Sequence, residues 1–194
     1  MKINTVEFVK SAEKKDHYPD YKHPEFAFIG KSNVGKSSLI NMVVNKKTLM
    51  RTGAKPGVTI TINFILMNKC FSIADLPGFG FAKISGETKK KLQPMIYEYF
   101  RNRKNLKLVF FLIDIRRTPD DAEKEIISFL AEHKIWTAIV ATKADKLTRN
   151  ELNKAINSLS ENLDIPVDSI FVSSATKRTG RDEILKLMQE YSSE

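Results

Sequence analysis

The sequence has a single cysteine and no apolar run long enough to cross a membrane. The lone Cys70 excludes an internal disulfide, and its place in an apolar run predicts a buried, inert thiol. A membrane span needs about 18 consecutive apolar residues, and the N-terminus lacks the apolar core of a signal peptide. These absences predict a cytoplasmic protein without stable membrane association.

Acidic residues are scarce relative to basic ones. The 194 residues include 32 Lys and Arg against 23 Asp and Glu, which gives a formal net charge of +9. Basic clusters recur along the chain at 14–15, 46–51, 89–91, 101–104 and 116–117. They can be solvated helix faces or an electrostatic footprint for RNA or another polyanion. No nucleic-acid recognition motif accompanies them, so composition leaves both interpretations open.

Short strand-like runs alternate with longer helical segments. Near-continuous apolar runs such as 108–113 indicate burial on both faces, as in a parallel sheet. Only Asn68 and Lys69 join two neighbouring strand segments, which allows a hairpin but no parallel crossover. The predicted strands are 25–29, 61–67, 70–74, 106–113, 136–141 and 170–172, and the predicted helices are 36–45, 87–101, 122–133, 150–162 and 181–191.

These elements predict a three-layer α/β fold. Its sheet is expected to be mixed and mostly parallel, with six strands, one antiparallel edge strand and helices on both faces. We see no repeat and no second domain, so residues 1–194 are expected to form one domain, with 1–22 packing on it as an N-terminal extension.

The strongest functional signal is a glycine-rich loop between a strand and a helix. Residues 30–37 read GKSNVGKS, the G-x-x-x-x-G-K-S pattern of a phosphate-binding loop. Its glycines let backbone N–H groups converge on phosphates where a Cβ would clash. Lys36 is expected to contact the β- and γ-phosphates, Ser37 to bind Mg²⁺, and the helix to offer its positive end. The predicted binding residues are Gly30, Lys31, Ser32, Asn33, Val34, Gly35, Lys36, Ser37 and Ser38.

Two further segments are expected to reach the γ-phosphate and its metal ion. Asp75, after a strand, can hold Mg²⁺ through water, and the Gly78 amide can reach the γ-phosphate. In the loop before the second strand, Thr59 or Thr61 can bind Mg²⁺ only while the γ-phosphate is present, and Thr59 is preferred. Taken singly, both segments can also be ordinary turns. The predicted binding residues are Gly57, Val58, Thr59, Ile60, Thr61, Asp75, Leu76, Pro77 and Gly78.

The last two strands are followed by segments that can read a purine base. The carboxylate of Asp145 can accept hydrogen bonds from guanine N1–H and N2–H₂, donors that adenine lacks, and the stem of Lys143 can lie along the base plane. The residues after the last strand can turn backbone N–H groups toward guanine O6. The predicted base-binding residues are Thr142, Lys143, Ala144, Asp145, Val172, Ser173, Ser174 and Ala175.

These motifs occur in a fixed order, each of them after a strand. With them the chain resembles the translation-factor-class GTP-binding proteins, which implies a P-loop NTPase fold of the Ras-like G-domain type. More narrowly, it resembles the EngB (YihA/YsxC) family of bacterial GTPases. The resemblance is carried by residues 28–41, 55–59, 62–64 and the run PGFGFA at 77–82, which general GTPases do not share. Val58 and Ile60 depart from the residues usual in such loops.

The family resemblance implies GTP and GDP as ligands, with Mg²⁺. It also implies a molecular switch in assembly of the large ribosomal subunit, with a link to cell division and septation. The expected partner is the large subunit or its precursor, through rRNA and ribosomal proteins, and we expect a monomer.

No residue is a certain catalyst, although Lys36, Thr59 and Gly78 can stabilise the γ-phosphate. Many GTPases place a glutamine directly after the Asp-x-x-Gly motif, where this chain has Phe79, whose ring cannot orient water. No arginine is an obvious finger. We therefore expect slow hydrolysis that a partner accelerates, the alternative being a GTP-gated binding module with negligible hydrolysis.

Asn33 leaves two interpretations. Some relatives with asparagine at this place in the phosphate loop bind K⁺, whose charge can replace that of an arginine finger. Alternatively, Asn33 shapes the loop through side-chain-to-backbone hydrogen bonds, and this second interpretation is preferred.

Overall fold

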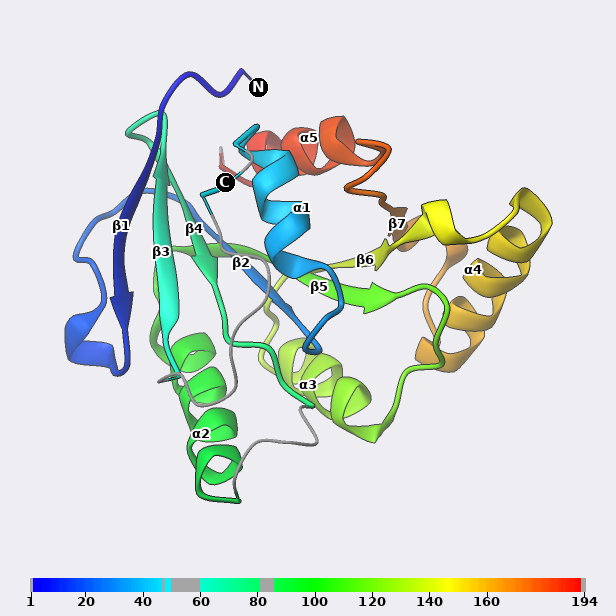
Figure 1. The fold of residues 1–194 in the computed structure, drawn as a ribbon. Coiled ribbons are helices and arrows are strands. Elements are labelled where there is room, and N and C mark those ends of the chain that lie inside the picture. The colour runs from blue at the N-terminus through cyan, green and yellow to red at the C-terminus, as the bar shows by residue number, and fades with distance from the viewer. Residues whose placement is uncertain (1, 47, 50–59, 81–85, 193–194) are drawn as a thin grey trace.

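A sheet of seven strands runs through the middle of the computed structural model, with helices on both of its faces (Figure 1). The structure describes residues 2–46, 48–49, 60–80 and 86–192, and for 86–89 it describes the backbone alone. The strand order is β1-β3-β4-β2-β5-β6-β7. The strands are β1 (Val6–Ala12), β2 (Glu25–Gly30), β3 (Ile62–Met67), β4 (Phe71–Asp75), β5 (Leu106–Asp114), β6 (Thr137–Thr142) and β7 (Ile170–Val172).

The sheet is mixed and mostly parallel, as predicted. Strands β4, β2, β5, β6 and β7 pair in parallel, whereas β3 runs antiparallel to both β4 and β1. Because the parallel strands point the same way, their carboxyl ends meet at one edge of the sheet. The loops that follow β2, β4, β6 and β7 therefore lie together at that edge.

The sheet has one strand more than the six predicted. Residues 6–12, expected to be part of an N-terminal extension, form β1 outside β3. All of 7–11 are exposed, and the register shifts between Phe8 and Lys10. An exposed edge strand with a bulge lacks the alternation of apolar and polar residues that reveals a strand in a sequence.

The β3–β4 connection is the tight hairpin that was predicted, but its cysteine lies elsewhere than expected. Asn68 and Lys69 have φ values of 50° and 57°, and the Cys70 N–H donates to the Met67 carbonyl at 3.0 Å. Cys70 is therefore part of the turn rather than of β4, and it is exposed. The prediction of a buried thiol is wrong, since the apolar run begins one residue later.

The helices begin and end close to the predicted positions. They are α1 (Lys36–Val43), α2 (Gly86–Asn102), α3 (Asp121–Glu132), α4 (Arg149–Leu163) and α5 (Arg181–Ser192). Thr148 caps α4 as predicted, since its hydroxyl accepts from the N–H of Glu151, whose side chain accepts from the Thr148 N–H. Asp120 and Glu123 form the same capping box at the start of α3.

Two hydrophobic cores lie on opposite faces of the central strands. Along β5, Phe110 and Leu112 pack in the core that contains α1 and α5, whereas Phe111 and Ile113 pack in the core that contains α2, α3 and α4. All four side chains are buried. Burial on both faces explains why β5 reads as an unbroken apolar run.

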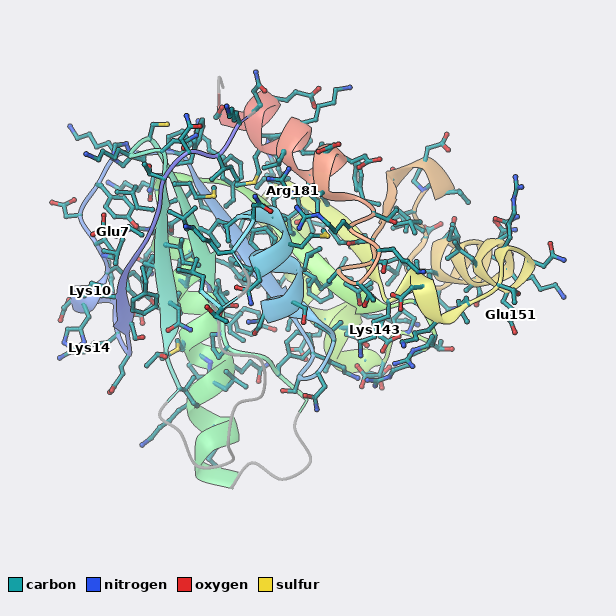
Figure 2. The ribbon with its side chains drawn as sticks, turned by 45° about the horizontal axis from the view of Figure 1, so that its top comes forward. Glu7, Lys10, Lys14, Lys143, Glu151 and Arg181 are labelled. Atoms are coloured by element: carbon teal, nitrogen blue, oxygen red, sulfur yellow. The ribbon has the colours of Figure 1, made fainter. Side chains whose placement is uncertain are left out.

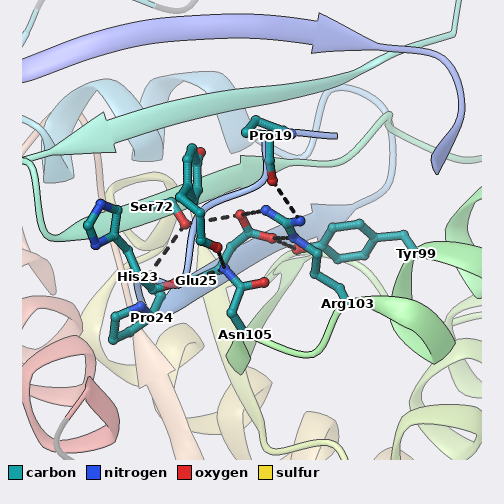
Figure 3. Close-up of polar contacts among 9 residues, drawn as sticks. Pro19, His23, Pro24, Glu25, Ser72, Tyr99, Arg103 and Asn105 are labelled. Atoms are coloured by element: carbon teal, nitrogen blue, oxygen red, sulfur yellow. Dashed lines mark hydrogen bonds and ion pairs between the residues drawn. The ribbon is translucent and has the colours of Figure 1, made fainter. Parts of the chain in front are cut away.

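At the amino end of β2, a buried carboxylate is held by four donors (Figure 3). Glu25 is fully buried and accepts from Ser72 Oγ at 3.0 Å and from the Tyr99 hydroxyl at 2.8 Å. Arg103 donates to both of its carboxylate oxygens, at 2.6 and 2.9 Å, and to the Pro19 carbonyl at 3.0 Å. A buried charge is tolerated only with such partners, so this group fixes the end of α2 against the start of β2.

Removing the cation from this group should destabilise the fold strongly. For Arg103→Met we expect the free energy of unfolding to fall by about 3–5 kcal/mol, because Glu25 stays buried without a counter-charge. Urea denaturation at pH 7 measures the change. The matched control is Lys104→Met, which removes the neighbouring exposed cation and should change stability by about 0.5 kcal/mol or less. Equal losses in the two variants would contradict this account.

Candidate nucleotide-binding site

The predicted binding residues gather at the carboxyl edge of the parallel strands. Figure 2 shows Lys143 on the loop after β6, beside the loop that leads from β2 into α1. An open cavity of about 210 Å³ lies between them. It is lined by Gly35, Ser38, Leu39, Thr142, Lys143, Asp145, Lys146, Ser173, Ala175 and Thr176.

The phosphate loop, residues 30–35, joins the end of β2 to the start of α1. Gly30 is the last residue of β2, and a Cβ there would lie 2.7 Å from the Leu112 carbonyl oxygen of the neighbouring strand. Gly35 precedes α1 with a φ of 104°, a conformation that other residues rarely adopt. Both glycines of the motif are therefore required by the backbone, and Lys36 and Ser37 form the first turn of the helix.

Lys36 forms an ion pair with Asp75 across this edge of the sheet. The Lys36 ammonium contacts Asp75 Oδ1, and their side chains are 12% and 5% exposed. The other carboxylate oxygen, Oδ2, accepts from the Asn63 amide at 3.3 Å. Lys36 is predicted to contact phosphates, and in that role it would exchange Asp75 for a phosphate and free one oxygen of a buried carboxylate.

The segment after Asp75 packs directly on the phosphate loop. A Cβ on Gly78 would lie 3.0 Å from Ser32 Oγ, and the Ser32 N–H donates to the Phe79 carbonyl at 2.9 Å. The Phe79 side chain is only 5% exposed, and its ring centroid lies 6.0 Å from that of Phe111 in the core. The ring is therefore part of the hydrophobic core below the phosphate loop.

Lys31 lies in the phosphate loop, but its side chain turns away from the cavity. It is 7% exposed and pairs with Asp120 and, at 3.4 Å, with Glu123. Burial tends to raise the pKa of Asp120, but the bond and charge of Lys31 and the bonds from Glu123 together outweigh it, so the pKa is lowered. The Lys31 side chain thus fastens the phosphate loop to α3, and only its backbone faces the cavity side.

The two segments predicted to read the base are in direct contact. Ser174 Oγ donates to Asp145 Oδ1 at 2.7 Å, and the Ala144 N–H donates to the Ser173 carbonyl at 3.2 Å. The Ser174 bond is the main reason that the pKa of Asp145 is lowered. Asp145 is therefore an oriented, ionised carboxylate at the cavity wall, able to accept two N–H donors from a ligand.

Lys143 links the base segment to the phosphate loop. Its ammonium donates to the Asn33 carbonyl at 2.5 Å and pairs with Asp114 at 3.0 Å. The neighbouring Thr142 hydroxyl donates to the Val34 carbonyl at 2.7 Å. These bonds hold the lysine stem across the cavity, between the two loops.

The sequence interpretation missed Asp114, which ends β5 and positions Lys143. Its carboxylate is buried and also accepts from the Arg116 side chain at 2.9 and 2.7 Å. Burial tends to raise the pKa of Asp114, but the bonds from Arg116 and Lys143 have the larger combined effect and lower it to about 2. The available signal was its place directly after an apolar strand, the same place that drew attention to Asp75.

Part of the predicted site lies outside the described residues, namely Gly57, Val58 and Thr59. Ile60 is partly buried against the core, and Thr61 directly precedes β3, which begins at Ile62. The competition between Thr59 and Thr61 for the metal therefore stays open.

Asn33 adopts a left-handed conformation with a φ of 64°. Asparagine tolerates this conformation better than most residues do, which agrees with a role in shaping the loop.

Two searches of the described residues bear on metals and membranes. Within 2–46, 48–49, 60–80 and 86–192, no three His, Cys, Asp or Glu side chains gather as a ready-made metal site. In the same ranges, none of the helices has the length and apolar character that crossing a bilayer requires.

Comparisons with known proteins agree on one class. A family model described as "50S ribosome-binding GTPase" matches residues 25–143. "Probable GTP-binding protein EngB" from Treponema denticola is 44% identical over 208 residues, covering 97% of this chain and 98% of the relative. The crystal structure of a probable GTP-binding protein engB is 30% identical, with a TM-score of 0.69 over 86% of this chain and 96% of that chain. An S. thermophilus NFeoB variant bound to GDP is 26% identical, with a TM-score of 0.58 over 87% and 62% of the two chains.

These matches confirm the predicted family, fold and enzyme class. The family model covers the phosphate loop, the Asp75 segment and the chain as far as Lys143, and the relative at 44% identity matches nearly the whole chain. The phosphate loop, the Asp75 segment and the base segment stand at the edge of the sheet where such a fold binds its ligand. The chain therefore belongs to the EngB family of GTP-binding proteins and is a GTPase with a Ras-like P-loop fold.

Proposed function

We propose that this GTPase is a slow, Mg²⁺-dependent switch that acts in assembly of the large ribosomal subunit, with a consequent link to cell division and septation. One observation carries the ribosomal part: the family model that matches residues 25–143 is that of a 50S ribosome-binding GTPase. The net charge of +9 supports a polyanionic partner such as rRNA. In this proposal residues 1–194 act as one GTP-binding domain, and the ribosomal partner places the protein in the cytoplasm.

The nucleotide is proposed to lie along the cavity, with its phosphates at the start of α1 and its base between Lys143 and Asp145. Asp145 is oriented by Ser174, and the stem of Lys143 is held between Asn33 and Asp114. GTP and GDP share the base and the first two phosphates, so both should bind. Gly78 packs on Ser32 of the phosphate loop, and we propose that its amide contacts the γ-phosphate, which only GTP carries.

The described residues fit a magnesium ion that is held largely by phosphates and water. Asp75 is a buried carboxylate whose Oδ1 becomes free when Lys36 leaves it, and Ser37 presents a hydroxyl in the first turn of α1. Mg²⁺ prefers such oxygen donors and keeps several waters. We assign Ser37, Thr59 and, through water, Asp75 to this ion, which neutralises charge on the β- and γ-phosphates. Asn33 is assigned to shaping the loop rather than to K⁺.

Slow hydrolysis follows from the side chain at position 79. Catalysis of phosphoryl transfer depends on positioning the water and stabilising charge, and the buried Phe79 ring does neither. Lys36, Thr59 and Gly78 remain to stabilise the γ-phosphate. We therefore propose that a partner accelerates turnover. The same observation supports a second candidate, a GTP-gated binding module in which hydrolysis is negligible.

Exchanging the base-reading carboxylate for an amide tests the nucleotide site. In Asp145→Asn we expect GDP affinity to fall by about 10- to 100-fold, because the amide cannot accept from both guanine donors. Affinity for xanthosine diphosphate should rise at the same time. Competition against a fluorescent GDP analogue measures both. The control is Ser174→Ala, which removes only the orienting hydroxyl and should weaken GDP binding without changing the preferred base. An unchanged preference in Asp145→Asn would refute the base assignment.

The support of Lys143 by Asp114 gives a second prediction. In Asp114→Asn the lysine loses its counter-charge, and we expect GDP affinity at pH 7 to fall by about tenfold. The pKa of Asp114 is about 2, below its ordinary 3.8, so its contribution to stability is complete above about pH 4 and disappears as the pH falls through 2. Unfolding experiments from pH 5 to 2 should therefore show a smaller acid-induced loss in the variant.

The matched control for this pair of measurements is Asp168→Asn, an exposed carboxylate in the turn before β7. It should leave both GDP affinity and the acid dependence of stability as in the wild type. Identical behaviour of the two variants would rule out the support that we assign to Asp114.

Sedimentation with ribosomal subunits tests the proposed partner. We expect the protein to co-sediment with the large subunit in a non-hydrolysable GTP analogue and to remain in the supernatant with GDP. Raising the salt from about 50 to 200 mM should lower the affinity for the large subunit by tenfold or more if basic side chains contact rRNA phosphates. The small subunit serves as the control particle. Equal binding to the large subunit with GDP and with the GTP analogue would exclude the switch. Acceleration of single-turnover hydrolysis by the large subunit would exclude the binding module.

A further inference from the structure

Three polar side chains form a row across neighbouring strands and end at the candidate metal site. Ser11 on β1 is paired in register with Asn63 on β3, and Asn63 is paired with Asp75 on β4. Side chains directly opposite one another in antiparallel strands lie on the same face of the sheet. The row therefore runs from the exposed edge of the sheet inward to a carboxylate that is 5% exposed.

The hydrogen bonds in this row fix the orientation of the central amide. An ionised carboxylate only accepts, so the NH₂ group of Asn63 has to face Asp75, and it donates to Oδ2 at 3.3 Å. The amide oxygen then faces the other way and accepts from the Ser11 hydroxyl at 2.7 Å. Both ends of the Asn63 amide are thus engaged, and its direction is determined by its partners.

Asp75 divides its two oxygens between partners of different kinds. Oδ1 contacts the Lys36 ammonium, which has to move away when a phosphate arrives, whereas Oδ2 contacts Asn63, which belongs to the sheet and makes no contact with the phosphate loop among the described bonds. When Lys36 departs, Asn63 is the partner that stays. It can keep the carboxylate plane in place and leave Oδ1 directed toward the start of α1.

We propose that Asn63 is a positioning residue for Asp75, which it holds so that Oδ1 is presented to a magnesium-bound water once Lys36 has moved to the phosphates. The inference rests on the proposed Mg²⁺-dependent nucleotide site. Asn63 touches neither nucleotide nor metal in this scheme, so it acts only through Asp75. A purely structural role for Asn63, in joining β3 to β4, would make a different prediction.

The test is a magnesium titration of binding to a fluorescent GDP analogue, with a parallel measurement in EDTA. For Asn63→Ala we expect the Mg²⁺ concentration at half-effect to rise by about threefold to tenfold, the range for losing one hydrogen bond of ordinary strength. Affinity in EDTA should stay within about twofold of the wild type, since Asn63 contacts no part of the nucleotide. Asn63→Leu, which fills the same volume without an amide, should shift the magnesium curve in the same direction.

Two control variants complete the design. Ser11→Ala removes the outer bond alone and should shift the magnesium curve by less than about twofold, because the bond from Asn63 to Asp75 remains. In an Asp75→Ala background, the additional Asn63→Ala change should have no further effect on the magnesium curve, since the residue that it positions is gone.

The outcomes of the magnesium titration separate the positioning role of Asn63 from the proposed function. If the wild type needs Mg²⁺ and the Asn63 variants give the same magnesium curve, the positioning role is wrong while the proposed function stands. A loss of affinity that is equal with and without Mg²⁺ would show a structural role and also overturn the inference. If wild-type binding ignores Mg²⁺ altogether, the magnesium part of the proposed function fails, and the role of Asn63 fails with it.

Discussion

The ion pair between Lys36 and Asp75 is the interaction on which the rest of the site depends. It joins the first residue of α1 to the last residue of β4, and both side chains are largely buried. Separating two buried charges is costly unless each finds a new partner. In the proposed function, phosphates would become the partners of the lysine and a metal-bound water that of the carboxylate. A ligand therefore has to supply both partners before the pair can separate.

The phosphate loop beside this pair is held by contacts on both of its sides. Lys31 anchors one side of the phosphate loop to α3, and Lys143 and Thr142 anchor its other side to the end of β6. Gly78 packs directly on Ser32 with no room for a side chain. The path of the loop backbone is therefore set by contacts with α3, with the end of β6 and with the segment after Asp75. Such a preformed cradle is what close packing of phosphates against backbone N–H groups requires.

Much of this arrangement could be predicted from the sequence, because it rests on local patterns. The helices and the six predicted strands begin and end within about two residues of their observed positions, since both cores impose clear periodicities on them. What the sequence did not reveal depends on pairing between distant segments. β1 is an exposed edge strand without alternation, and Cys70 belongs to the hairpin turn although it adjoins the apolar run of β4. The contact of Asp114 with Lys143, and that of Asn63 with Asp75, join residues that lie far apart in the sequence or on different strands.

The missed strand β1 and the missed residue Asn63 are connected. Without β1, the outer side of β3 would face solvent, and the Asn63 amide oxygen would have water rather than Ser11 as its partner. The antiparallel ladder brings three side chains into one row, so an edge strand that contributes nothing to the cavity still constrains the carboxylate at its rim. Asn63 thus holds Asp75 from within the sheet, and Lys36, the first residue of α1, holds it from the opposite side. In the proposed function, only the contact with Lys36 has to break.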